Sequence, residues 1–172
     1  MKRRSALFAP LAAAIGLCGL CSSPAALALD APKGKVVLTV TGKVGAPNKG
    51  TTAVFDMAML QKLPQRTFST QTPWDPKPTT FTGPLLRDVL AAAKATGTTL
   101  EATALNDYKI TLPVDDATQF DVVLAHTMNG EAIPVRTKGP LFIIYPFDSQ
   151  AELKAVKYYE RSIWQLKTLS VQ

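Results

Sequence analysis

The chain has 172 residues, of which 47% are hydrophobic and 19% are charged, and its formal net charge is +6 at pH 7. It contains one histidine, His126, which excludes a zinc or copper site built from several imidazoles. No run of basic residues follows residue 4, so the sequence gives no support to nucleic-acid binding.

The first 28 residues have the three parts of a secretory signal peptide. A Lys-Arg-Arg start occupies 2–4, an apolar run covers 7–20, and Ala-Leu-Ala at 26–28 has the small-x-small pattern of a cleavage site. The apolar run is shorter than the ~20 residues of a membrane-spanning helix, and no later stretch is long enough to span a bilayer. We therefore expect a cleaved signal, a periplasmic protein and one domain over 29–172.

Both cysteines, Cys18 and Cys21, lie within the predicted signal peptide. The signal also carries three of the 19 basic residues and none of the 13 acidic ones, which leaves the domain with a net charge of +3. A domain without cysteine forms no disulfide and offers no thiolate as a nucleophile or metal ligand. We therefore expect its fold to depend on core packing alone.

Two strands and a short helix are predicted in the first part of the domain. The strands are rich in β-branched residues, and the helix is capped by Asp56 and ended by Pro64. Glycine and proline mark the loops between them. In chain order these segments are a strand at 36–41, a loop at 42–50, a helix at 57–63, a strand at 67–70 and a loop at 72–77.

The clearest predicted helix carries an apolar stripe from Leu85 to Ala93. We place Pro84 near its first turn, where a missing N–H costs little, and Gly97 at its end. The alternating residues at 108–112 then predict a half-buried strand.

The last third of the chain predicts a hairpin and further strands. The dipeptide Asn129-Gly130 is a strong hairpin signal, and an apolar run after Gly139-Pro140 is typical of a central strand. The predicted segments are strands at 120–128, 132–136 and 141–145, a helical or irregular stretch at 150–159, and an alternating strand at 162–171 with Trp164 in the core. Many short strands with two or three helices indicate the α+β class, with mixed or antiparallel sheets.

Seven segments, in their order and spacing, carry a resemblance to a known family. They are 81–90 (FTGPLLRDVL), 106–108 (NDY), 113–116 (PVDD), 123–126 (VLAH), 129–131 (NGE), 139–141 (GPL) and 163–166 (IWQL). Together they resemble the sulfite-oxidase fold, the molybdopterin-binding oxidoreductase domain. The resemblance runs from residue 36 to residue 171 and implies that fold for the whole domain.

The same resemblance implies a molybdenum ligand that this sequence lacks. Members of the family typically bind molybdenum through a cysteine four residues before a tryptophan, and carry an arginine four residues before a proline in the apolar strand. Here Trp74 matches the tryptophan, but Thr70 stands in the place of the cysteine and Phe142, before Pro146, in the place of the arginine. A threonine hydroxyl is a poor substitute for a soft thiolate. The resemblance therefore implies the fold and not the redox chemistry.

Eight residues are candidates for lining a ligand-binding cleft. They are Thr70, Thr72, Trp74, Asn106, Asp107, Tyr108, Arg136 and Lys138. Trp74 either walls a pocket or fills the core, and Asn106-Asp107 either contacts a ligand or forms a turn. Arg136 and Lys138, beside a glycine, either hold an anion or lie in a solvated loop.

No catalytic residue is predicted. His126 fits a structural hydrogen-bonding role, Asp115-Asp116 fits a helix or turn cap, and no Gly-x-Ser-x-Gly motif is present. We expect an exported domain that binds a small ligand or a partner protein, such as a membrane sensor or a redox partner, with no cofactor and no bound metal. The alternative is a molybdopterin-dependent oxidoreductase that holds its cofactor through the pterin and phosphate, without a cysteine ligand.

Overall fold

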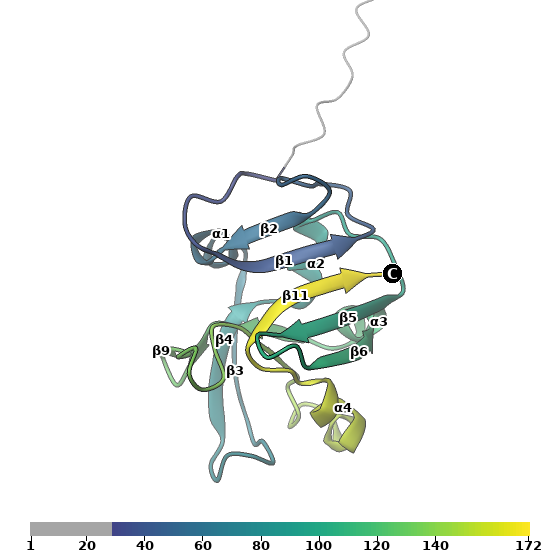
Figure 1. Ribbon diagram of the computed structural model, residues 1–172. Helices are drawn as coiled ribbons and strands as arrows, with labels where there is room; N and C mark the ends of the chain where they lie inside the picture. The colour runs from purple at the N-terminus through teal and green to yellow at the C-terminus, as the bar shows by residue number, and fades with distance from the viewer. Residues whose placement is uncertain (1–28) are drawn as a thin grey trace, which may run out of the picture.

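The computed structural model describes residues 29–172, so the predicted signal peptide lies outside the described residues. This part of the chain forms three sheets and a few short helices (Figure 1), which confirms the predicted α+β class. The strands are β1 Val36–Gly42, β2 Ala53–Asp56, β3 Gln65–Thr70, β4 Thr79–Pro84, β5 Thr99–Ala104, β6 Lys109–Pro113, β7 Val123–Ala125, β8 Thr127–Met128, β9 Glu131–Ala132, β10 Phe142–Ile144 and β11 Leu166–Val171. The helices are α1 Met57–Lys62, α2 Leu86–Ala92, α3 Val114–Gln119, the 3-10 helix η1 Ala151–Lys154 and α4 Val156–Arg161.

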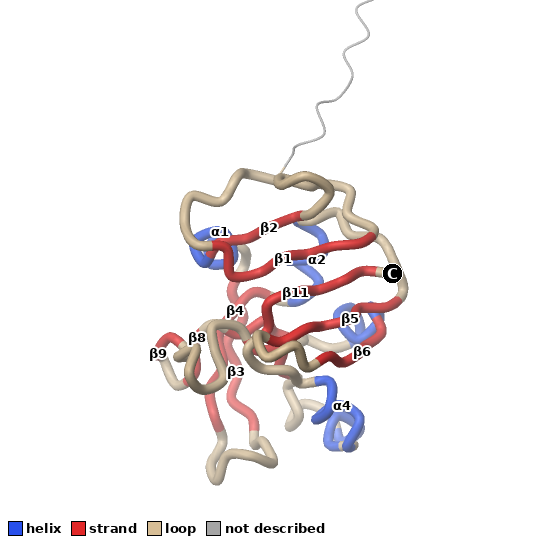
Figure 2. The backbone as a smooth tube through the Cα atoms, viewed as in Figure 1, coloured by secondary structure: helices blue, strands red, loops and turns tan. Residues whose placement is uncertain are grey.

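The largest sheet joins the two ends of the domain. Its strand order is β2-β1-β11-β5-β6, and β1 pairs in parallel with β11 while the other pairs are antiparallel. Alternate residues such as Leu38 and Val40 are fully buried, as the period of two in a strand requires. In the view that Figure 1 and Figure 2 share, α1, α2 and α3 (labelled in Figure 1) lie behind this sheet, and their buried apolar residues form part of the core.

The second layer consists of the sheet β3-β4-β8-β9 and the pair β10-β7. Strands β4 and β7 lie so close that a Cβ at Gly83 would stand 2.1 Å from the carbonyl oxygen of Leu124. Only glycine fits such an approach of two backbones. In Figure 1 the β3–β4 hairpin extends away from the large sheet, and its long connecting loop carries Trp74.

Several predicted elements are confirmed by the structure. Asp56 caps α1, accepting a hydrogen bond from the backbone N–H of Met59 at 2.8 Å. Asn129 and Gly130 adopt φ values of 54° and 84° between β8 and β9, which is the conformation a two-residue hairpin turn needs. Asp56 and the Asn129-Gly130 pair act on backbone groups within a few residues of themselves, and the sequence alone therefore predicts the cap and the turn.

The clearest predicted helix is shorter than expected at both ends. Pro84 is the last residue of β4, not part of the first turn, because it pairs with Gln65 of β3. The helix ends at Ala92, and Lys94 takes the left-handed conformation with φ 46°. Gly97 therefore does not end the helix; a Cβ there would lie 2.3 Å from the carbonyl oxygen of Gln172. This glycine is required by the close approach of the C-terminus.

The predicted strand at 120–128 is divided into β7 and β8 at His126. Its backbone N–H donates to the carbonyl of Thr82 at 3.0 Å, and its ring Nε2 lies 2.8 Å from Oε1 of Gln65. The chain leaves the β10-β7 pair here and joins β4 instead. The predicted structural role of His126 is confirmed by these hydrogen bonds, and burial lowers the pKa of its imidazole, which favours the neutral form of the ring.

The remaining strand predictions need smaller corrections. The return strand of the hairpin, β9, ends at Ala132, and 134–139 form a turn closed by the N–H of Gly139 on the carbonyl of Pro134. The predicted strand at 162–171 begins only at Leu166, since Gln165 adopts a positive φ of 53°. Strand β2 was not predicted, because its four residues adjoin the stronger helix signal of α1.

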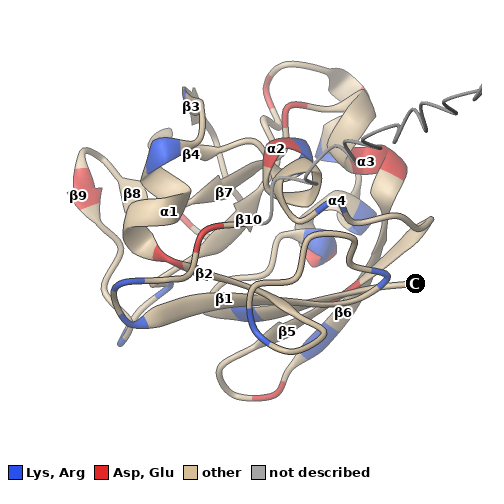
Figure 3. Cartoon of the chain, turned by 90° about the horizontal axis from the view of Figure 1, so that it is seen from above, with Lys and Arg blue, Asp and Glu red and all other residues tan. Residues whose placement is uncertain are grey.

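Figure 3 shows the basic positions scattered over the described chain and not gathered on one face. Among residues 29–172, no helix combines the length and the apolar character needed to cross a bilayer.

Candidate functional site

A cavity of about 430 Å³ lies where three segments meet. The β3–β4 loop contributes Trp74, the end of β5 and the turn after it contribute Asn106 and Tyr108, and the segment from α4 to β11 contributes Tyr159 and Trp164. Four aromatic side chains therefore line one hollow, although they come from distant parts of the sequence. Trp164 and Tyr108 are 41% and 55% exposed, so the aromatic lining is open to solvent.

Trp74 is the centre of the aromatic cluster behind this cavity. Its ring centroid lies 6.0 Å from that of Phe142, 6.1 Å from that of Phe147 and 5.9 Å from that of Trp164. The contacts with Phe147 and Trp164 are edge-to-face, an arrangement that stabilises packing beyond the area it buries. The indole Nε1 is buried and has no hydrogen-bond partner within the described part of the chain. Both alternatives for Trp74 hold in part, because the ring packs on the core and also lines the cavity.

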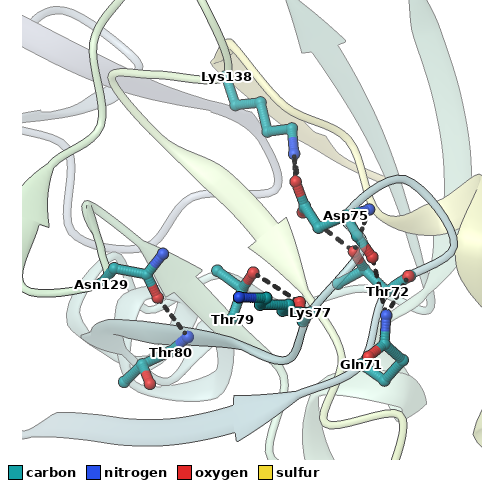
Figure 4. Close-up of polar contacts among 8 residues, drawn as sticks. All are labelled: Gln71, Thr72, Asp75, Lys77, Thr79, Thr80, Asn129 and Lys138. Carbon is teal, nitrogen blue, oxygen red and sulfur yellow. Dashed lines mark hydrogen bonds and ion pairs between the residues drawn. The ribbon is translucent and has the colours of Figure 1, made fainter.

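Three polar residues fix the loop that carries Trp74 (Figure 4). The hydroxyl of Thr72 donates to the carboxylate of Asp75 at 3.0 Å, and the backbone N–H of Asp75 donates back to that hydroxyl at 3.1 Å. Lys138 donates to both oxygens of Asp75, at 2.9 and 3.0 Å. The ammonium of Lys138 also lies 5.9 Å from the centroid of the Trp74 ring. Thr72 and Lys138 therefore position the loop and do not themselves line the cavity.

Thr70, which the resemblance places where the family has its cysteine, is buried and hydrogen-bonded to Asp148. Its hydroxyl donates to Oδ2 of Asp148 at 3.2 Å and accepts from the backbone N–H of Asp148 at 3.1 Å. The same carboxylate accepts from the backbone N–H of Gln71 at 2.6 Å and pairs with Lys154 at 3.0 Å. The Thr70 side chain thus ties the end of β3 to the 146–149 turn, away from the cavity lining.

The pKa of Asp148 is lowered chiefly by the backbone N–H of Gln71 and then by Lys154. A carboxyl whose folded pKa lies below the ordinary 3.8 adds stability above pH 3.8, and this contribution is lost as the pH falls through the lower value. We expect Asp148→Asn to destabilise the protein at pH 6 and to differ less from the parent as the pH falls towards 2. Urea unfolding at a series of pH values measures the difference in unfolding free energy between the parent and Asp148→Asn. A difference that stays constant with pH would contradict the prediction.

The 106–108 segment is a turn whose members point in different directions. The backbone N–H of Tyr108 donates to Oδ1 of Asn106 at 3.2 Å, and Asp107 adopts a positive φ of 65°. The carboxylate of Asp107 pairs with Lys167 and lies outside the cavity lining, whereas Asn106 and Tyr108 line it. The turn interpretation is therefore correct, and the turn also presents two of its three side chains to the hollow.

The wall formed by α4 is anchored to the core by a buried ion pair. Asp116 of α3 accepts from Nη1 of Arg161 at 2.8 Å and from the hydroxyl of Tyr145 at 2.7 Å. Burial, and then the neighbouring carboxylate, raise the pKa of the Tyr145 hydroxyl, which therefore remains a donor. The prediction that Asp116 caps a helix is wrong, because Pro113 occupies the N-cap position of α3 and Asp116 points inward.

One charged residue, Glu160, borders the cavity, and no lysine, arginine or histidine does. Arg136 is exposed in the 134–139 turn and is not brought to the cavity. Of the eight predicted residues, Trp74, Asn106 and Tyr108 line the cavity, and Lys138 and Thr72 support its loop. Thr70, Asp107 and Arg136 lie outside the lining.

Sequence reasoning missed the contribution of Tyr159, Glu160 and Trp164. The prediction of Trp164 as a core residue of a strand is wrong, because β11 begins two residues later and the indole is 41% exposed. The only sequence signal was the presence of Trp164 in one of the seven segments that carry the resemblance. The Tyr-Tyr-Glu stretch of α4 gave no such signal, since the direction of its side chains depends on the distant Asp116–Arg161 pair.

Comparison with known proteins agrees with this fold. A family model described as "Oxidoreductase molybdopterin binding domain" matches residues 28–161, and six of the seven segments quoted above lie within that range. No curated protein matches the chain. The match confirms the family and the sulfite-oxidase fold expected from the sequence. The chain belongs to the family of oxidoreductase molybdopterin-binding domains.

Proposed function

We propose that this domain binds a small organic molecule in the cavity walled by Trp74 and Trp164, and that its side chains do not ligate molybdenum. The observation that carries the proposal is the pairing of two features. The position of the family's cysteine holds Thr70, whose hydroxyl is engaged with Asp148, while four aromatic side chains line a separate hollow.

The side chains of residues 29–172 do not fit a protein-ligated molybdopterin. They include no cysteine, and they contain no cluster of three or more histidine, aspartate and glutamate side chains that could hold a metal. Molybdopterin also carries a phosphate, which proteins hold with arginine, lysine or a helix N-terminus. The cavity is lined by one carboxylate and by no cation. The cavity therefore offers neither a soft metal ligand nor a cationic partner for a phosphate.

The size and lining of the cavity support binding of a small molecule. Ligand pockets commonly measure about 300–1,000 Å³ and have apolar walls with a few polar groups. Here four of the lining residues are aromatic, and Asn106, Glu160 and Ser162 are the polar residues among them. The loop of Trp74 is held by Asp75 and Lys138, so the largest wall is pre-organised and loses little freedom on binding.

The two tryptophans of the chain provide a direct test. Both Trp74 and Trp164 line the cavity, so the intrinsic tryptophan fluorescence of the protein reports on this site alone. We expect members of a fragment library with cationic, neutral and anionic compounds to shift or quench this emission in a saturable way. Calorimetry on each hit then measures its affinity independently of fluorescence.

Two variants separate binding in the cavity from binding elsewhere. Trp164→Ala removes a wall and is expected to weaken each hit at least about tenfold. Val156→Ala, on α4, removes an exposed apolar side chain that does not line the cavity and is expected to leave affinity unchanged. If no compound binds, or if hits bind Trp164→Ala as well as the parent, the proposal is wrong.

The family match favours a second candidate function. In it, the domain is an oxidoreductase that holds molybdopterin through the pterin and phosphate, without a protein ligand to the metal. This candidate requires molybdenum and pterin in the purified protein, whereas the cavity-binding proposal does not.

We also propose that the protein acts in the periplasm, on the basis of the charged start, apolar run and Ala-Leu-Ala site at 1–28. Mass spectrometry of the protein from the periplasmic fraction is expected to show a chain that begins near Leu29. A full-length chain in the cytosol would contradict export.

A further inference from the structure

The charges around the cavity are unbalanced. Glu160 lines it and takes part in none of the ion pairs formed within residues 29–172. The adjacent Arg161 does not compensate for this charge, because its guanidinium is bound to Asp116 at 2.8 Å. The ammonium of Lys138, near Trp74, is likewise neutralised by both oxygens of Asp75. Glu160 is therefore the one charged residue of the lining, and none of the ion pairs within residues 29–172 neutralises it.

The aromatic walls of the cavity also favour a positively charged ligand. The ring planes of Trp74 and Trp164 meet at 74°, and those of Trp74 and Tyr159 at 85°. The face of an aromatic ring is electronegative and attracts a cation placed within about 6 Å of it, most strongly for tryptophan. The ammonium of Lys138 already lies at such a distance, 5.9 Å from the Trp74 centroid. A cation at this distance from the Trp74 ring is therefore already part of the structure, where the carboxylate of Asp75 balances its charge.

We propose that the cavity recognises an organic cation, such as a quaternary or tertiary ammonium compound, between its aromatic walls and Glu160. This inference rests on the proposed function of the cavity as a small-molecule site and names the class of ligand. The aromatic faces contact the alkyl groups around the cationic nitrogen, and the carboxylate of Glu160 neutralises its charge at the solvent edge. An anion would meet the same carboxylate with no lysine or arginine of the lining to offset it.

Three probes that have nearly the same shape but different charges separate the effect of ligand charge on affinity from the effect of ligand shape. Choline is the cation, 3,3-dimethylbutan-1-ol is its neutral isostere, and 3,3-dimethylbutanoate is the corresponding anion. We expect choline to bind at least about tenfold more tightly than the neutral alcohol, and the anion to bind least. Affinities are measured by tryptophan fluorescence and calorimetry on the intact domain at low ionic strength. Added salt is expected to weaken only the binding of choline.

A pair of charge-neutralising variants assigns the effect to Glu160. We expect Glu160→Gln to weaken choline about fivefold and to leave the neutral alcohol unchanged. The matched control is Glu152→Gln, at an exposed position on η1 outside the cavity lining. We expect it to leave the affinities for choline and for the neutral alcohol unchanged. Both side chains are exposed, so neither substitution disturbs the core.

The outcomes distinguish this inference from the proposed function. If the alcohol or the anion binds as tightly as choline, or if Glu160→Gln leaves choline binding unchanged, the cation inference is wrong and the small-molecule function stands. If none of the three probes binds, the cation inference is also wrong. The proposed function fails when the broader fragment screen also finds no ligand, or when its hits bind Trp164→Ala as tightly as the parent.

Discussion

Replacing Asp116 by alanine is expected to lower the free energy of unfolding by about 3–5 kcal/mol. The carboxylate is 5% exposed and accepts from Arg161 at 2.8 Å and from the Tyr145 hydroxyl at 2.7 Å. Alanine leaves a largely buried guanidinium without its counter-charge and a fully buried hydroxyl without an acceptor. Losing one partner of a buried pair is far more damaging than losing an exposed charge. Urea unfolding followed by circular dichroism measures the change.

Two variants make this result specific to the buried pair. Asp115→Ala removes the neighbouring exposed carboxylate and is expected to change stability by less than about 0.5 kcal/mol. Tyr145→Phe removes one hydroxyl and leaves the ion pair, so a loss of about 1 kcal/mol is expected. A loss for Asp116→Ala no greater than that for Asp115→Ala would show that the pair does not hold α4.

Trp74→Ala is expected to lower the free energy of unfolding by about 3 kcal/mol, because the indole joins the loop to the core. Its ring packs against Phe142, Phe147 and Trp164 at centroid distances of 5.9 to 6.1 Å. Truncating a large aromatic residue removes this burial and leaves a cavity behind. This expected loss of free energy lies at the low end of the range for truncating a large aromatic residue, because Trp74 is only partly buried. Denaturant unfolding followed by circular dichroism measures the loss.

Trp74→Phe distinguishes packing from hydrogen bonding at the same position. The indole N–H is buried and unpaired within residues 29–172, so replacing it by a ring without a polar atom removes an unsatisfied donor. We expect a loss of less than about 1.5 kcal/mol for this variant. Losses of equal size for phenylalanine and alanine would contradict the packing account and would imply that the N–H bonds a group bound in solution.

Local chemistry explains which parts of the fold could be predicted. Asp56 caps α1, and Asn129-Gly130 turns the hairpin, because each acts on its own backbone within a few residues. Errors occur where tertiary pairing overrides a local pattern. Pro84 suits a helix start but pairs with Gln65, and the apolar run through His126 divides because its two halves join different sheets.

The site was less predictable than the fold, for a related reason. Trp74 was identified because the family resemblance drew attention to it. Tyr159 and Glu160 line the same hollow because long-range contacts hold α4 in place, among them the pair between Arg161 and Asp116 of α3. No single-sequence pattern encodes that pairing. The sequence resemblance alone indicated Thr70 in the place of the family's cysteine, and the structure adds the hydrogen bonds of Thr70 to Asp148.

The most direct test of the account is the metal and pterin content of the protein. The full chain is expressed in cells that make molybdenum cofactor and purified from the periplasm, and molybdenum is measured by mass spectrometry and pterin by its fluorescence after release. A family member that retains the cysteine, purified from the same cells, shows that cofactor was available. The account predicts molybdenum and pterin far below one per chain. One molybdenum and one pterin per chain would contradict it and establish the oxidoreductase alternative.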